Sequence, residues 1–592
     1  MTQPQHKTAS RRSAGVHYAD EAARALLAGH LGVVEDPAAA GWQLVKRNAS
    51  RCVWRGSVGG QSVYLKQFHA RSLGRRLIRA LGVSRARREM HFAAALQRAG
   101  VEAVPILAWA CGGGREWVVS RAVEPASNLD AWHEAKAADR GGSGLGRVEE
   151  ASAALAGMIA RMHRAGIFHQ DLHCGNILIK GGQGPVQLVL MDLHRISQGR
   201  ATRAAMAANL AQLLCDRCDF TTRSQRLRFL KHYLAALGGD GTARGWQMMI
   251  ERSAARHRRG IRGKRDRRVL KDNAYFARIK LARGWRGHVV LASKRKFPPS
   301  VACEATFEAD QWKTLLERPE SLLEGDVEVL KDSRSSLVVR RSVAMGGREI
   351  AMHIKRPRRK QWYKIVIDCF RPSRPVRAFE LGHGLLTRRI ATALPLAALE
   401  RRWGPLLLDS ILITETVLCP RLNDFFNAHL SVPPSGEQQL TPTQQRQLAQ
   451  DVLTEMGRLL QRLHDNNYAH RDLKANNMLV HWRGGRCPGI VLVDLDGLRP
   501  VRLLTQRRRF QGLMRLNVSL LNCPVVNHAG QLRMLLGYLR RPGSGRINFK
   551  PYWRVLEAWS ARKLRQQIRS RRITQAALRQ RQGDGGRSTL PI

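Results

Sequence analysis

The chain repeats one long pattern twice, and this repeat constrains the fold more than any other feature of the sequence. The segment HQDLHCGNILI at 169–179 returns as HRDLKANNMLV at 470–480. Each copy is followed by an apolar run that contains an acid, LVLMDLH at 188–194 and IVLVDLDG at 490–497. Corresponding positions lie roughly 300 residues apart, so each unit of the repeat is a whole domain and not one turn of a solenoid.

The match extends upstream of these motifs. VYLKQF at 63–68 and AMHIKR at 351–356 read as strands that carry one lysine. Each follows a Gly-Gly turn and an earlier strand, which predicts a β-hairpin. A helical pattern comes next and holds one candidate acid, Glu89 or Glu380, which lies 23 or 25 residues after the lysine.

Together these residues form the set that phosphoryl transfer from ATP requires. A strand lysine holds the phosphates, and a helical glutamate holds that lysine. One aspartate faces the acceptor hydroxyl, while an asparagine and a later aspartate offer the oxygen ligands that Mg²⁺ prefers. The first half supplies Lys66, Glu89, Asp171, Asn176 and Asp192, and the second supplies Lys355, Glu380, Asp472, Asn477 and Asp494. This is the signature set of protein-kinase-like enzymes, and it predicts ATP and Mg²⁺ as cofactors.

Simpler roles remain open for several of these positions. His169 and His470 precede the first aspartates, and we expect them to position the loop and not to act as bases. Glu89 and Glu380 could be solvated helix acids, although each has the right position to pair with its lysine.

The expected fold is of the α+β class, with two tandem bilobed protein-kinase-like domains and ATP between the lobes of each. From the amino terminus, the expected parts are a disordered tail (1–15), a first domain (16–290; N-lobe about 40–125, C-lobe about 126–290), a linker (291–320), a second domain (321–579; N-lobe about 321–418, C-lobe about 419–579) and a second disordered tail (580–592).

One part of the kinase signature is missing. Neither copy has a GxGxxG loop between its first two strands, where the chain reads LVKRNASRCVW at 44–54 and VLKDSRSSLVV at 329–339. Serine, arginine and main-chain N–H groups could bind phosphate there. Ordinary polar hairpin turns would read the same way.

At these motifs the chain resembles the lipopolysaccharide core kinases that phosphorylate heptose or Kdo sugars. The resemblance rests on the glycine-poor hairpin, on DLHR within LVLMDLHRI in place of the usual DFG, and on the basic helix RSQRLRFLKHYLAALG. It covers roughly 40–290 and 320–575. It implies an ATP-dependent phosphotransferase with an alcohol group as acceptor, acting on heptose or Kdo of the lipopolysaccharide inner core.

Two features depart from that family, which is known as single-domain enzymes. This chain holds two domains. In addition, HRDLKANN is more similar to the loop of eukaryotic-type protein kinases, which place a lysine near the transferred phosphate at the position of Lys474, where the first copy has His173. The alternatives are a serine/threonine-type protein kinase, in the second half especially, or one half that is a non-catalytic pseudokinase binding module.

The charge of the chain indicates an anionic partner. Lysine and arginine number 100 against 46 acids, a net charge of +54, and residues 252–296 hold 17 of the basic residues. Such a surface attracts nucleic acid, an anionic membrane or phosphorylated substrates. The aromatic content is 6% and no zinc-finger, RNP or KH signature occurs, which disfavours nucleic acid. An anionic membrane surface explains the same charge, and the stretch 552–573 suits an interfacial helix or a core helix equally.

The sequence also predicts where the chain works. It has no apolar signal core and no apolar run near the ~18 residues of a membrane span, so we expect a cytoplasmic protein at the inner face of the inner membrane. Ten scattered cysteines fit free thiols in a reducing compartment. Cys215 and Cys218 form a CxxC without the further ligands that zinc needs. The oligomeric state is not indicated.

Overall fold

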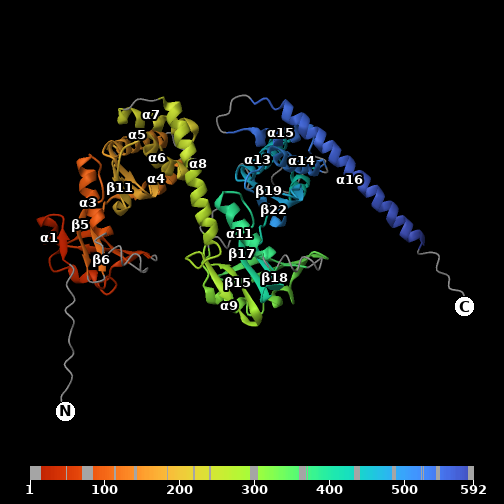
Figure 1. The fold of residues 1–592 in the computed structure, drawn as a ribbon, viewed down its shortest axis with the longest axis horizontal. Helices are drawn as coiled ribbons and strands as arrows, with labels where there is room; N and C mark the ends of the chain where they lie inside the picture. The colour runs from red at the N-terminus through yellow and green to blue at the C-terminus, as the bar shows by residue number, and fades with distance from the viewer. Residues whose placement is uncertain are drawn as a thin grey trace, which may run out of the picture. The chain divides into compact units, whose positions relative to one another are not determined.

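The computed structural model describes residues 15–47, 50–69, 84–112, 115–138, 143–182, 184–217, 221–238, 242–293, 305–358, 369, 371–431, 440–482, 488–521, 523, 526–541 and 547–584. The chain divides into two compact units, Met1–Gly260 and Ile261–Ile592. Each unit has a lobe built on an antiparallel sheet and a lobe built mainly of helices (Figure 1). The predicted α+β class is therefore confirmed.

The sheet lobe of the first unit has six antiparallel strands in the order β1-β5-β6-β4-β3-β2. The strands are β1 (Val16–Tyr18), β2 (Gln43–Arg47), β3 (Arg51–Val58), β4 (Gln61–Phe68), β5 (Ile106–Gly112) and β6 (Arg115–Arg121). Gly59 and Gly60 make the predicted turn between β3 and β4, and both have positive φ, which glycine adopts without strain. The lobe also holds α1 (Glu21–Leu27), η1 (Leu31–Val34) and α3 (Arg85–Arg98).

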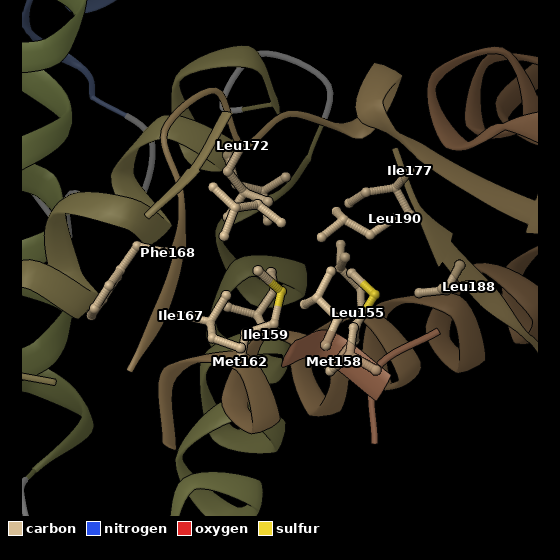
Figure 2. Close-up of a cluster of buried hydrophobic side chains, with 14 of the residues drawn as sticks. Leu155, Met158, Ile159, Met162, Ile167, Phe168, Leu172, Ile177, Leu188 and Leu190 are labelled. Atoms are coloured by element: carbon tan, nitrogen blue, oxygen red, sulfur yellow. The ribbon is translucent and has the colours of Figure 1, made fainter. Parts of the chain in front are cut away.

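The helical lobe of the first unit surrounds the loop of the repeated motif. Helix α5 (Ser143–Arg164) presents Met158, Ile159 and Met162 to side chains that flank the loop, among them Leu172 and Leu190 (Figure 2). The other elements are β7 (Ala126–Asn128), α4 (Leu129–Ala138), β8 (Ile167–His169), η2 (Cys174–Asn176), β9 (Ile177–Lys180), β10 (Leu188–Leu190), η3 (Leu193–Arg195), β11 (Ile196–Gln198), α6 (Arg203–Arg217), α7 (Arg223–Leu237) and α8 (Ala243–Arg268), whose residues from Ile261 onward belong to the second unit. The motif is therefore held in place by close packing against a buried apolar core.

The sheet lobe of the second unit has seven antiparallel strands in the order β12-β13-β17-β18-β16-β15-β14. The strands are β12 (Phe276–Lys280), β13 (Trp285–Val290), β14 (Glu328–Ser333), β15 (Ser336–Met345), β16 (Arg348–Pro357), β17 (Pro395–Trp403) and β18 (Leu406–Glu415). The helices of this lobe are η4 (Ala282–Gly284), α9 (Ala309–Leu315), η5 (Pro319–Leu323) and α11 (Arg374–Thr387).

The first two of these strands shift the boundary that the sequence predicts. Residues 276–290 were expected to end the first domain, yet β13 pairs with β17 in the second sheet, with Val289 opposite Ala397. Trp285 is buried in that core, and Trp312 of the expected linker is buried there too. The burial of these apolar side chains places the basic residues 261–293 in the second unit. The boundary between the units therefore follows Gly260, ahead of the division that the sequence predicts at 290.

The helical lobe of the second unit repeats the plan of the first. Its elements are α12 (Leu422–Phe426), η6 (Asn427–Ser431), α13 (Pro442–Asp465), β19 (Tyr468–His470), η7 (Ala475–Asn477), β20 (Met478–His481), β21 (Gly489–Leu492), η8 (Leu495–Gly497), β22 (Leu498–Pro500), α14 (Gln506–Leu520), α15 (His528–Leu539) and α16 (Lys550–Asp584). Leu556 of α16 is fully buried, and Trp553 packs against the same core. The amino-terminal turns of α16 are therefore part of a core helix.

Two further predictions concern membrane-spanning helices and the CxxC motif. No helix within the described ranges is both long and apolar enough to cross a bilayer. In the CxxC, the Cys215 thiol donates a hydrogen bond to the carbonyl oxygen of Ala254 at 3.3 Å, and Cys218 lies outside the described residues.

Each helical lobe buries a histidine against a tyrosine, which gives the stability of both units a pH dependence. His163 Nδ1 lies 2.8 Å from the Tyr233 hydroxyl, and His464 Nδ1 lies 3.0 Å from the Tyr538 hydroxyl. Burial lowers the pKa of His163 to about 4 and that of His464 to about 3.

We expect both units to lose stability as the pH falls from about 6.5, where an unfolded histidine titrates, towards these lower values. In that window the unfolded chain binds protons that the folded chain does not. Each histidine therefore lowers the free energy of unfolding by roughly 1.4 kcal/mol per pH unit as the pH falls. Urea denaturation at pH 7 and pH 5 measures the loss. The double variant His163→Gln/His464→Gln should show a flatter dependence, and an unchanged slope in that variant would contradict the assignment.

Candidate active site

Lys66, Glu89 and Asp192 meet in the first unit, although they come from three separate elements. Lys66 lies on β4 opposite Val53 of β3, and Glu89 lies in α3. The Lys66 ammonium donates to both carboxylate oxygens of Glu89 at 3.2 Å and to Asp192 at 3.3 Å. Glu89 is 0% exposed and the Lys66 side chain 11%, so this is an enclosed ion-pair cluster.

Two residues that sequence reasoning did not single out complete this cluster. Arg51, the first residue of β3, donates from both terminal nitrogens to the two carboxylate oxygens of Asp192, each at 2.9 Å. His194 Nδ1 lies 2.9 Å from Glu89 and donates to it. The glycine-poor hairpin thus delivers a bidentate arginine to the site, the pairing that guanidinium groups favour.

These contacts fix the charges of the cluster. Burial alone would raise the pKa of Asp192, but Lys66 and Arg51 outweigh it and hold that pKa far below its usual range. Burial would likewise raise the pKa of Glu89, and the Lys66 charge with the His194 hydrogen bond lowers it instead. Lys66 keeps a raised pKa against the effect of its burial because of the two carboxylates. All three groups are therefore ionised at neutral pH.

Four short strands hold the loop of the first motif. Strands β8 and β11 pair His169 with Ile196, and β9 and β10 pair Ile177 with Leu190. Because β9 begins directly after Asn176 and β10 ends two residues before Asp192, this pairing brings the two predicted metal ligands to one place. Met191 N–H donates to the Asn176 carbonyl oxygen at 2.9 Å, which closes the arrangement.

The motif histidine positions the loop, as expected. The main-chain N–H of Asp171 donates to His169 Nδ1 at 3.2 Å, and His169 Nε2 donates to the Met191 carbonyl oxygen at 3.1 Å. His169 is 0% exposed, and burial lowers its pKa, so the ring is neutral with its proton on Nε2. Asp171 itself is exposed to solvent.

The donor set of the first unit fits a hard divalent cation. The Asn176 amide nitrogen donates to the Asp171 carbonyl oxygen at 2.9 Å, so the amide oxygen is the atom that could act as a ligand. Together with the Asp192 carboxylate it gives the all-oxygen donors that Mg²⁺ prefers. The guanidinium of Arg51 would have to yield the Asp192 oxygens to such an ion.

The loop of the second unit has the same construction. His470 pairs with Leu498 across β19 and β22, and Met478 pairs with Leu492 across β20 and β21. The Asp472 N–H donates to His470 Nδ1 at 3.2 Å, and the Asn477 amide donates to the Asp472 carbonyl oxygen at 3.0 Å.

The lysine of the second unit has different partners from those that the sequence predicts. The Lys355 ammonium lies 3.2 Å from Asp494 and 2.6 Å from Asp496. The expected partnership of Lys355 with Glu380 is not present. Glu380 lies instead near Asp266, and burial together with that negative charge raises its pKa. Asp494 and Asp496 are 44% and 42% exposed, so this site is open where that of the first unit is enclosed.

Both predicted metal-binding aspartates have a left-handed backbone. Asp192 has φ 56° and ψ 48°, and Asp494 has φ 58° and ψ 76°. A residue with a side chain is uncommon in this region, and such strain concentrates at functional sites. The same strained conformation at the same motif position in both units supports a shared role.

The comparison with protein families agrees with this geometry. The model of the lipopolysaccharide kinase (Kdo/WaaP) family matches the chain twice, over residues 40–233 and 354–538. The chain belongs to this family. Each match contains one complete loop with its aspartate, asparagine and second aspartate, so the predicted fold of two tandem protein-kinase-like domains is confirmed. No curated protein matches the chain in a sequence comparison.

Solved kinase structures are similar to parts of this family member. WaaP in complex with acyl carrier protein is 22% identical with a TM-score of 0.31, covering 41% of this chain and 98% of that chain. The BubR1 kinase domain is 12% identical with a TM-score of 0.26, covering 36% and 79%. The Mycobacterium tuberculosis PknI kinase domain is 16% identical with a TM-score of 0.22, covering 36% and 97%.

Membership of the lipopolysaccharide kinase family makes the chain a phosphotransferase that uses ATP. The structure brings Lys66 to Glu89 and Asp192, and Lys355 to Asp494, as the sequence predicts. Sequence reasoning missed Arg51, His194 and Asp496, which contact the same groups. The signal for the last two was available, because each lies two residues after a predicted metal-binding aspartate and carries a group that can meet a carboxylate or an ammonium.

Proposed function

We propose that both units transfer the γ-phosphoryl group of ATP, with Mg²⁺, to a hydroxyl of an anionic glycolipid, heptose or Kdo of the lipopolysaccharide inner core. The observation that carries this proposal is the double family match, in which each half encloses one complete loop. The convergence of Lys66, Glu89 and Asp192 at 3.2–3.3 Å supports it independently of the family.

The proposed roles follow from the geometry of each loop. Asp171 and Asp472 are exposed and receive the proton of the acceptor hydroxyl. Lys66 and Lys355 hold the ATP phosphates, while Glu89 orients Lys66. Mg²⁺, held by Asn176 with Asp192 and by Asn477 with Asp494, would neutralise charge on the transferred group.

A cavity in the first unit favours an acceptor with acyl chains. It has a volume of about 320 Å³, and its lining includes the apolar side chains of Leu155, Leu210 and Leu230. It reaches Cys174, three residues after Asp171. Charged side chains of both signs also line it, among them Arg223 and Glu251, and Arg228 paired with Glu149 at 2.8 Å. The apolar walls beside the catalytic loop suit the acyl part of such an acceptor.

The net charge of +54 supports the same acceptor class and a peripheral position on an anionic membrane surface. Lipid A phosphates and Kdo carboxylates would attract the chain over a range that salt screens. We expect co-sedimentation with vesicles that contain lipopolysaccharide to fall steeply between 50 and 500 mM NaCl. Binding that is independent of salt would contradict an electrostatic attachment.

The test of the acceptor is direct. The purified full-length chain, incubated with labelled ATP, Mg²⁺ and lipopolysaccharide, should transfer label to the core oligosaccharide. Mass spectrometry of the core from cells with and without the chain should differ by a phosphate on a core sugar. Unlabelled lipopolysaccharide and identical cores would overturn the proposed acceptor.

A protein acceptor for the second unit is the alternative that one observation favours. Lys474 lies 2.6 Å from Asp472, at the position where eukaryotic-type protein kinases carry a lysine beside the transferred phosphate. Mixed proteins and lipopolysaccharide, offered in parallel to the chain with labelled ATP, separate the two cases. Label in proteins that disappears with Asp472→Asn would identify the second unit as a protein kinase.

A further inference from the structure

Each lysine contacts the aspartate that follows the loop, Asp192 or Asp494, and one further acid. The two units place this further acid on different elements. In the first unit Glu89 of α3 contacts Lys66, and the residue two places after Asp192 is His194, which bonds to Glu89. In the second unit the residue two places after Asp494 is Asp496, and it contacts Lys355 directly at 2.6 Å.

The helix caps give the register between the two helices. Both α3 and α11 have 14 residues and follow a capping serine, Ser84 or Ser373, whose hydroxyl accepts a main-chain N–H three residues later. Counted from these caps, the position of Glu89 corresponds to Ala378, which is 5% exposed. Helix α11 therefore has a methyl group where α3 has a carboxylate.

The same register explains the position of Glu380. It lies two residues after Ala378, and two residues turn an α-helix by about 200°. Glu380 is thus on nearly the opposite side of α11, towards Asp266, whose charge contributes to its raised pKa. Asp266 belongs to α8 and binds Arg388 through two hydrogen bonds of 2.9 and 2.7 Å, so this side of α11 is occupied by a separate ion pair.

Each lysine still has two carboxylates. Lys66 has Glu89 and Asp192, and Lys355 has Asp494 and Asp496. The number of negative charges at the lysine is the same in both units. The second charge comes from helix α3 in the first unit and from the turn η8 in the second.

We propose that Asp496 is the positioning residue of the second site, which orients Lys355 towards the ATP phosphates in place of a helical glutamate. This inference rests on the proposed kinase function of the second unit. Asp496 lies on η8, in the same turn as Asp494, so one short segment sets both the lysine and the metal ligand. Helix α11 takes no part in that ion pair, whereas a shift of α3 in the first unit would break the contact between Glu89 and Lys66.

Photolabelling of the full-length chain with 8-azido-ATP, followed by peptide mapping, tests this because it reports each half separately and needs no acceptor. Competition with ATP gives the affinity of each half. Asp496→Asn should weaken ATP competition in the second half by at least tenfold and leave the first half unchanged as an internal control. Glu380→Gln should leave both halves unchanged, and Glu89→Gln should weaken only the first.

A rescue separates positioning from a general structural loss. Adding Ala378→Glu to Asp496→Asn restores an acid at the helical position and should recover most of the lost competition. Unchanged competition in Asp496→Asn, tighter competition in that variant, an effect of Glu380→Gln as large as that of Asp496→Asn, or no recovery with Ala378→Glu would each overturn the inference. No ATP-sensitive labelling in the second half of the unmodified chain would overturn the proposed function of that unit as well, so the two failures are distinguishable.

Discussion

Replacing Asp171 and Asp472 together by asparagine should reduce ATP-dependent phosphoryl transfer by about 10²–10⁴-fold, the contribution of a positioned general base. Both aspartates are exposed, and the hydrogen bonds that Asn176 and Asn477 donate to them use their main-chain carbonyl oxygens, which the substitution leaves in place. In the second unit the substitution also weakens the exposed ion pair of Asp472 with Lys474. Asparagine has nearly the same shape but accepts no proton at neutral pH. Each single variant should remove only the transfer that its own unit performs.

Product analysis of the four chains, unmodified, two single variants and the double variant, measures this effect. Full transfer by the double variant would show that the catalytic bases are misassigned. Full transfer by one single variant, with complete loss in the other, would show that one unit is a pseudokinase. ATP competition in the photolabelling assay should be retained in all four chains, which separates loss of chemistry from loss of nucleotide binding.

Lys66→Met should destabilise the first unit by about 3 kcal/mol, whereas Lys355→Met should cost the second unit less than about 1 kcal/mol. The difference comes from burial. Glu89 is 0% exposed, so removing Lys66 leaves an enclosed carboxylate without its ammonium partner. Asp494 and Asp496 are 44% and 42% exposed, and water can solvate them once Lys355 is gone.

Hydrogen–deuterium exchange resolved by peptide measures the two effects in the same chain. Peptides from β4 and α3 should lose protection in Lys66→Met, and peptides from β16 and α11 should keep theirs in Lys355→Met. Both variants should nevertheless lose ATP competition in their own half. Equal loss of protection in both variants would contradict the burial argument.

Sequence reasoning paired Glu89 with Lys66 because Glu89 is the one acid in its helix, and the structure shows this contact at 3.2 Å. It misplaced Glu380 for a geometric reason. The spacings of 23 and 25 residues between lysine and glutamate look equivalent along the chain, but a difference of two positions reverses the side of a helix. The capping serines Ser84 and Ser373 supply the correct register, because a cap fixes where a helix begins.

The domain boundary was hidden for a different reason. Residues 252–296 are so basic that the charge masks a strand pattern in which Ile279, Trp285 and Val289 point into a core. Charge patterns report what a surface attracts, and the burial of alternate side chains reports which sheet a strand joins. The pairing of Arg51 with Asp192 was missed because sequence reasoning assigned the arginines of the first hairpin to phosphate and not to an aspartate of the site.

The strands β12 and β13 determine how this protein can be divided for separate study of its halves. A fragment that starts at residue 291 would lack both strands, leave the backbone of β17 as a bare edge and remove Trp285 from its pocket. A fragment that starts at 261 keeps the strands but opens inside helix α8, of which Asp266 still has to reach Arg388. A carboxy-terminal fragment therefore needs the last turns of α8, extended by a few residues upstream, to retain a complete sheet.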